Sequence, residues 1–184
     1  MWPWGHLAFG YLCYSLGSRI GTRTSPGDRD TLALAVGTQF PDLIDKPLAW
    51  WVGVLPGGRT LTHSLLVAVP LVALGIAVGR RYGFGLPAVA FGVGYGTHLV
   101  GDAIGPLTAG RYGELAFLLW PATPTVVYEG EASLLWHLTT ITLSPLFVLE
   151  GLLVALVVGL WIADGAPVLS ALPSVVSDTD EDRR

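Results

Sequence analysis

Long stretches without a formal charge separate the few charged residues of this 184-residue chain. Residues 60–79 and 82–101 are each about 20 residues long, enough for a helix to cross a hydrocarbon layer of about 30 Å. Residues 1–18 form a shorter stretch, and residues 132–163 form a longer one that only Glu150 interrupts. These stretches predict an all-α chain, folded as a polytopic membrane bundle of about five apolar helices.

The stretch 31–55 differs from the others because Pro41, Asp42 and Asp45 lie in its middle. A proline inside a helix removes a backbone hydrogen bond, and a broken helix at membrane depth needs protein or water around it. We therefore expect this second helix to be broken at Pro41–Asp45. The other expected helices cover residues 4–18, 61–79, 86–105 and 133–162, with a short interfacial helix at 114–120.

The composition supports a membrane protein over a soluble enzyme. Apolar residues make up 52% of the chain and charged residues only 13%, about half the charged share of a soluble domain. The net charge of −4 offers no basic surface for nucleic acid. The single cysteine, Cys13, excludes an internal disulfide and a cysteine-rich metal site. We expect one integral-membrane domain over residues 1–176 and a charged, disordered tail over 177–184.

Titratable side chains inside apolar stretches are candidates for function, because a charged group at membrane depth is costly. His98 and Asp102 stand four residues apart and therefore share one helix face. Such a pair can ligate one ion, or the carboxylate can orient the imidazole. The complete set is His6, Asp42, Asp45, His63, His98, Asp102, His137 and Glu150.

Each of these residues also has a structural interpretation. Asp42 and Asp45 can cap a helix that restarts after the expected break. His6 and His63 can be interfacial histidines at the ends of their helices. The choice between the two interpretations depends on whether the residues meet in space.

Alternation of the helix direction brings most of these groups to one end of the bundle. The residues expected there are His6, Asp42, Asp45, His63, His98, Asp102 and His137, whereas Glu150 is expected away from them. The side of the cluster carries three basic residues and the opposite side carries five. Those on the side of the cluster are Lys46, Arg59 and Arg111, and those on the opposite side are Arg19, Arg23, Arg29, Arg80 and Arg81. The positive-inside rule therefore predicts an extracytoplasmic cluster and a cytoplasmic tail.

Histidines combined with carboxylates form a nitrogen and oxygen ligand set that suits zinc, with manganese or iron as alternatives. Such an ion generates hydroxide near neutral pH and polarises a phosphoryl or carbonyl oxygen. Asp45 and Arg59 are the expected catalytic residues, and arginine binds phosphate in a bidentate manner. The expected ligands of one or two ions are His6, Asp42, His63, His98 and Asp102.

Four sequence blocks resemble the YdjM-like family of membrane-bound metal-dependent hydrolases. The blocks are Gly5-His6, Phe40-Pro41-Asp42-Leu43-Ile44-Asp45, Arg59-Thr60-Leu61-Thr62-His63-Ser64-Leu65 and Gly96-Thr97-His98-Leu99-Val100-Gly101-Asp102. They span about residues 5–107, and Asp42 matches the first aspartate of the family's acidic block. The resemblance implies an integral membrane enzyme that depends on a divalent metal.

The order of these residues is also similar to the metal-binding half of zinc-dependent phospholipase C and the related single-strand nucleases. That similarity implies phosphoester chemistry. The residues it implies for a first ion are Asp42, His63, His98 and Asp102, with His6 and Asp102 helping at a second. The later His-x₃-Glu pair of those enzymes is missing, because Ile141 stands four residues after His137. A three-metal centre is therefore not expected.

We therefore expect a membrane metallohydrolase, a phosphoesterase that acts on a lipid or lipid-linked substrate near the membrane surface. Membrane lipid is the expected partner. The alternatives are a non-catalytic membrane protein with a structural metal or polar network, and a proton or metal carrier. A catalytic site keeps one coordination position open, whereas four protein ligands close a structural site.

Overall fold

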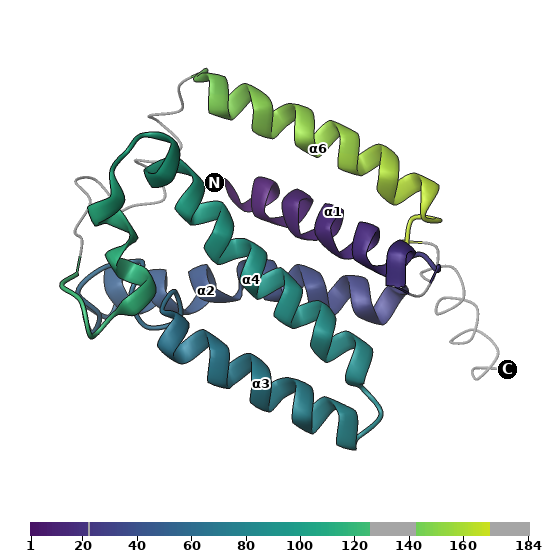
Figure 1. The fold of residues 1–184 in the computed structure, drawn as a ribbon, viewed down its shortest axis with the longest axis horizontal. Coiled ribbons are helices and arrows are strands. Elements are labelled where there is room, and N and C mark those ends of the chain that lie inside the picture. Colours follow the sequence, from purple (N-terminus) through teal and green to yellow (C-terminus); the bar gives the residue numbers. More distant parts are fainter. Residues whose placement is uncertain (22, 126–142, 170–184) are drawn as a thin grey trace, which may run out of the picture.

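A computed structural model describes residues 1–21, 23–125 and 143–169 of the chain. This part of the chain is helical and contains no strand, which confirms the all-α fold. Apart from the start of the last one, the helices lie close to the predicted segments, and the tail 177–184 lies outside the described residues. The elements are α1 (Pro3–Gly21), α2 (Asp28–Trp50), α3 (Leu65–Arg81), α4 (Gly85–Thr108), the 3₁₀ helix η1 (Tyr112–Leu119) and α6 (Pro145–Ala163) (Figure 1).

The predicted break at Pro41–Asp45 is wrong, because α2 runs without interruption from Asp28 to Trp50. Carbonyl groups in this part of the helix find donors on other elements. The Thr38 carbonyl accepts a hydrogen bond from His98 at 2.7 Å, and the Pro41 carbonyl accepts one from the Thr62 hydroxyl at 3.1 Å. These contacts tie the middle of α2 to α4 and to the turn before α3.

Helix α4 is the centre of the bundle and contacts α1, α2, α3 and η1. Helix α6 packs along α1, and Figure 1 shows α3 and α6 at opposite outer edges. At the far end of α1 from the N-terminus, the buried Asp164 carboxylate fastens α6 to α1. It accepts hydrogen bonds from the Tyr11 hydroxyl at 2.9 Å and the Ser15 hydroxyl at 2.7 Å, and it pairs with Arg19.

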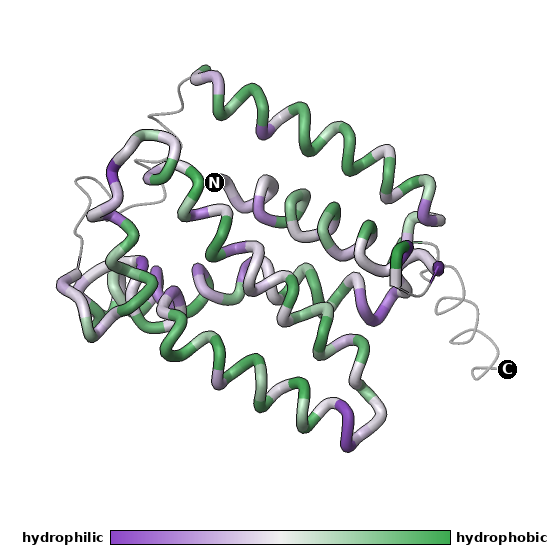
Figure 2. Tube along the Cα trace, viewed as in Figure 1, coloured by the Kyte–Doolittle hydropathy of each residue, from purple (hydrophilic) through white to green (hydrophobic). Residues whose placement is uncertain are grey.

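The outer helices turn large apolar side chains outward, while several polar side chains lie inside the bundle. Figure 2 shows that α3 and α6 are hydrophobic along most of their length. Exposed apolar faces of this extent are unusual on a soluble monomer and suit contact with lipid. The exposed residues on these helices include Leu66, Val69, Leu74, Val78, Leu149, Leu152, Leu156 and Ile162.

Among the described residues, α6 is the one helix that is long and apolar enough to cross a membrane, with a mean hydropathy of 2.5. This test uses length and composition alone. The other helices carry more polar residues or are shorter. The number of membrane crossings therefore stays a prediction.

Helix α4 meets α2 at glycines, where the two backbones come close together. A Cβ atom at Gly94 would lie 2.9 Å from the Thr38 nitrogen and would overlap the Leu34 carbonyl oxygen. A Cβ atom at Gly37 would likewise overlap the carbonyl oxygen of Phe91 on α4. This close approach sets the distance between the acidic residues of α2 and the histidine of α4.

Replacement of Gly94 by alanine is expected to destabilise the bundle by about 1–3 kcal/mol, because the obstructing atoms belong to the backbone. Gly96 on the same helix is the matched control, since no atom of the described part of the chain lies within 4 Å of its Cβ position. Alanine favours a helix over glycine by about 1 kcal/mol, so Gly96→Ala is expected to unfold at or above the wild-type temperature. Thermal unfolding of the detergent-purified proteins measures the midpoint temperature of each variant. Equal midpoints for the two variants would contradict the close packing.

Candidate metal centre

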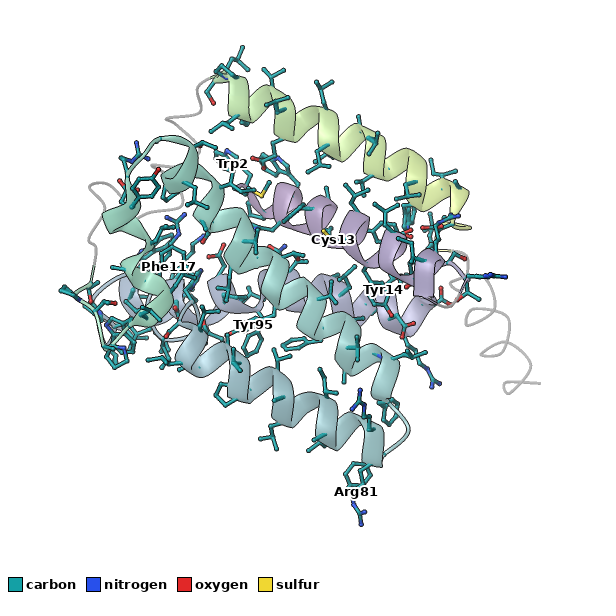
Figure 3. The ribbon with its side chains drawn as sticks, in the orientation of Figure 1. Trp2, Cys13, Tyr14, Arg81, Tyr95 and Phe117 are labelled. Atoms are coloured by element: carbon teal, nitrogen blue, oxygen red, sulfur yellow. The ribbon has the colours of Figure 1, made fainter. Side chains whose placement is uncertain are left out.

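The predicted ligands come together at one end of the bundle although four separate elements carry them. His6 lies on α1, Asp42 on α2, and His98 and Asp102 on α4, while His63 lies in the turn just before α3. The three histidines and Asp102 are buried, and the Asp42 side chain is 12% exposed. Figure 3 labels Phe117 at this end, and its ring packs 6.2 Å from the ring of His63.

The turn that carries His63 is fixed by contacts at its two sides. Ser64 caps α3, because its side chain accepts a hydrogen bond from the Leu66 nitrogen at 3.2 Å. The Tyr95 hydroxyl donates to the Thr62 carbonyl at 2.5 Å, and Figure 3 shows Tyr95 between α4 and α3. These contacts hold the His63 side chain toward α2 and α4.

Hydrogen bonds at Nδ1 determine how the His63 and His98 rings face the cluster. His98 Nδ1 must carry hydrogen, since its partner at 2.7 Å is the Thr38 carbonyl, which can only accept. His63 Nδ1 lies 2.8 Å from the Asp45 carboxylate and is the donor for the same reason. In the neutral rings, both Nε2 atoms therefore present lone pairs, and they lie 3.2 Å apart. Two facing lone pairs at this distance repel each other, and either a proton on one nitrogen or a metal cation between the two would relieve the repulsion.

Two carboxylate oxygens complete the arrangement around these nitrogens. His63 Nε2 lies 3.5 Å from Asp42 Oδ1 and 3.5 Å from Asp102 Oδ2. His98 Nε2 lies 3.8 and 3.7 Å from the same two oxygens. Ligand atoms at tetrahedral zinc distances are about 3.3–3.6 Å apart. Asp42, His63 and His98 thus place three ligand atoms at spacings close to those around a tetrahedral ion, which leaves its fourth position open.

A buried polar atom without a partner supports the same interpretation. Among the residues that the structure describes, no hydrogen-bond partner reaches the buried Asp42 Oδ1, although Asp42 Oδ2 pairs with Lys46 at 2.5 Å. Leaving a buried oxygen without a donor is costly, so such groups call for an explanation. A cation held between Asp42, His63 and His98 would satisfy it, because these three side chains place one ligand atom each within 4.8 Å of one another.

His6 takes part in a second group of candidate ligands with His98 and Asp102. Its Nε2 lies 3.3 Å from Asp102 Oδ1, and its ring stacks on His98 with the centroids 3.9 Å apart. Asp102 also accepts a hydrogen bond from Arg59 Nε at 2.8 Å. Asp102 is therefore shared between the cluster and the Arg59 guanidinium.

Asp45 lies behind His63 and does not face the other ligands. Its fully buried carboxylate accepts hydrogen bonds from the backbone nitrogens of Thr60 and Thr62 at 2.9 and 3.0 Å. It also accepts from the Thr62 hydroxyl at 2.7 Å and from His63 Nδ1. This arrangement orients the imidazole in the way that a carboxylate partner of a metal-bound histidine does.

The expectation that Glu150 lies away from the cluster is wrong. Helix α6 begins at Pro145 and not near residue 133, so Glu150 lies in its second turn. The Glu150 carboxylate accepts a hydrogen bond from the Trp2 nitrogen at 2.9 Å and packs against Gly5, next to His6. It also lines a cavity of about 280 Å³ between α4 and α6. The segment expected to begin at residue 133 includes His137, which lies outside the described residues.

The residues that support the ligands are marked only weakly in the sequence. Thr62 and Tyr95 hold the His63 turn, and the Thr38 carbonyl orients His98. A backbone carbonyl leaves no mark in the sequence, so the contribution of Thr38 could not be found there. Thr62 directly precedes His63 at the edge of an apolar stretch, and this position is the one sequence feature that points to its supporting role.

Apolar outer helices around a buried cluster of histidines and aspartates are the features of a helical membrane protein with a candidate metal centre. The chain belongs to the YdjM inner membrane protein family, because the profile of that family matches residues 1–176. The match confirms the family resemblance of the four sequence blocks and supports a membrane location. No curated protein matches the chain, and no solved structure matches it.

Proposed function

We propose that this protein is a multi-pass membrane hydrolase whose activity depends on one divalent metal centre. The observation that carries the proposal is the convergence of His63 Nε2, His98 Nε2 and the unpartnered Asp42 Oδ1. Zinc is the ion that this mixed set of nitrogen and oxygen ligands favours, with manganese or iron as alternatives. A bound ion would supply Lewis-acid activation and a hydroxide near neutral pH.

The side chains around the cluster suit an anionic substrate such as a phosphoester. Lys46 and Arg59 lie beside Asp42 and Asp102 and are 30% and 23% exposed. They form the accessible edge of the cluster, so a phosphate group approaching from this side would meet both cations. Arg59 is thus the side chain proposed to contact substrate, and a guanidinium is suited to phosphate oxygens.

The sequence led us to expect a catalytic role for Asp45, but in this proposal Asp45 is not a catalytic residue. It is a positioning residue, because its oxygens are engaged by the turn that carries His63. It holds His63 Nδ1–H and so keeps Nε2 available to an ion. No substrate atom could reach this carboxylate without opening the turn.

A lipid or lipid-linked substrate fits the surroundings of the cluster. The cavity between α4 and α6 is lined mostly by apolar residues together with Glu150, and it reaches Gly101, whose Cβ position is 3.0 Å from His6 Nδ1. A substrate could therefore bring a hydrocarbon chain from the lipid side and a phosphate from the side of Lys46. The proposed orientation places this end outside the cytoplasm, following the positive-inside rule.

The test of this proposal is substrate hydrolysis by the detergent-purified protein loaded with zinc, manganese or iron(II), with the products identified by mass spectrometry. The substrates are a lipid phosphomonoester, a lipid phosphodiester and a carboxylic ester of the same chain length. Metal-dependent hydrolysis of a phosphoester is expected, with Arg59→Lys reducing kcat/KM by about 10–100-fold, since one guanidinium contact with a phosphate is lost. Val100→Ala, an exposed change on α4, is the control. Tight metal binding without turnover of any of the three would favour the structural-metal alternative.

A further inference from the structure

The two groups of candidate ligands overlap at a single atom. One group contains Asp42, His63 and His98, and the other contains His6, His98 and Asp102. His98 can offer only Nε2 to either group, because its Nδ1 is held by the Thr38 carbonyl at 2.7 Å. The lone pair of one imidazole nitrogen serves one ion at a time.

We propose that the cluster is a one-ion centre with two alternative ion positions that share His98 Nε2. The outer position uses Asp42 and His63, and the inner position uses His6 and Asp102. This inference rests on the proposed metal centre and specifies how many ions it holds. The chemical class of the ligand is a divalent cation that accepts imidazole and carboxylate donors.

The two positions differ in their access to the surroundings. The outer position includes Asp42, whose side chain is 12% exposed and which is paired with the half-buried Lys46. All three ligands of the inner position are buried, with His6 at 1%, His98 at 0% and Asp102 at 4% exposure. An ion at the outer position is the one that a substrate near Lys46 and Arg59 can reach, whereas an ion at the inner position is enclosed by protein.

Short distances between the ligand atoms make movement between the two positions feasible. His63 Nε2 lies 3.5 Å from Asp102 Oδ2, and His6 Nε2 lies 3.3 Å from Asp102 Oδ1. An ion can therefore exchange His63 and Asp42 for His6 through Asp102 while His98 stays bound. The close stacking of the His6 and His98 rings, at 3.9 Å, already holds the incoming imidazole beside the retained one.

Metal titration of the intact protein in detergent tests this inference. Cobalt(II) is the probe, since its visible absorption reports the ligand set, and native mass spectrometry with zinc(II) gives the number of ions per chain. We expect wild type to saturate at one ion. Asp42→Ala and His6→Ala are each expected to saturate at one ion as well. Asp42→Ala should bind the ion more than tenfold more weakly than wild type. The cobalt spectra of the two variants should differ from each other.

Four results would overturn the inference. Two ions per wild-type chain would exclude a shared His98 while leaving the metal centre intact. Complete loss of the ion in either Asp42→Ala or His6→Ala would leave a single position only. Identical cobalt spectra for the two variants would also exclude alternative positions. No ion in wild type would remove both this inference and the proposed function, whereas one ion without hydrolysis would remove the proposed function alone.

Discussion

Replacement of His98 by alanine is expected to abolish metal binding and every metal-dependent activity of this protein. His98 is the one residue common to both groups of candidate ligands, and its Nε2 lies 3.2 Å from that of His63. Loss of a group that only orients a metal-bound histidine already costs about 10–100-fold in metal affinity, so loss of the shared ligand itself should cost more than 100-fold. Hydrolysis should fall to the rate of the metal-free protein.

Thermal unfolding in the presence and absence of zinc gives an independent measurement of the same effect. A ligand that binds only the folded state at 100 times its dissociation constant stabilises the fold by about 2.7 kcal/mol. Wild type and Val100→Ala should therefore unfold at a higher temperature with zinc, whereas His98→Ala should not respond. An equal response of His98→Ala and wild type would show that the ion binds elsewhere or not at all.

A second large effect is expected when Asp45 is substituted, because this residue contributes both to the stability of the fold and to metal affinity. Asp45→Ala removes the acceptor for the Thr60 and Thr62 nitrogens, the Thr62 hydroxyl and His63 Nδ1. Buried donors without an acceptor cost about 1–3 kcal/mol each, and partial hydration of the site reduces their sum. We expect the free energy of unfolding to fall by about 3–5 kcal/mol, measured by denaturant titration in detergent.

Asp45→Asn separates the two roles because it keeps the size of the side chain. Its amide can accept through only one oxygen, so His63 loses part of its orientation while the turn keeps much of its packing. Metal affinity should then fall by about 10–100-fold at a smaller cost in stability. Leu43→Ala is the matched control on α2, since Leu43 is 63% exposed. Unchanged metal affinity in Asp45→Asn would contradict the positioning role.

Much of the fold followed from the spacing of the charges along the chain. Four of the expected helices appear within a few residues of their predicted bounds, as for 86–105 against α4 at Gly85–Thr108. This agreement has a physical cause, because uncharged stretches of about 20 residues have few stable structures other than a helix in an apolar environment. The start of α6 was missed because the apolar stretch continues without a break before Pro145.

The sequence predicted which residues form the candidate site better than it predicted the role of each residue. His6, Asp42, His63, His98 and Asp102 stood out because each is a titratable group in an apolar stretch. Their ring orientations depend on backbone carbonyls and on residues far away in the chain, which no spacing reveals. Asp45 resembled Asp42 in the sequence, and only its contacts with the turn at 60–63 assign it to a supporting position.

The spacing of charges and apolar residues was enough to predict a helical, apolar chain that carries a small set of histidines and carboxylates. Tertiary structure determined that α2 continues through Pro41 and that its Thr38 and Pro41 carbonyls meet donors from His98 and Thr62. It also decided that Glu150 lies beside Gly5 and that one nitrogen of His98 serves two sets of ligands. The reason is that local preference depends on neighbours in the chain, whereas hydrogen-bond partners and ligand geometry depend on how separate helices pack.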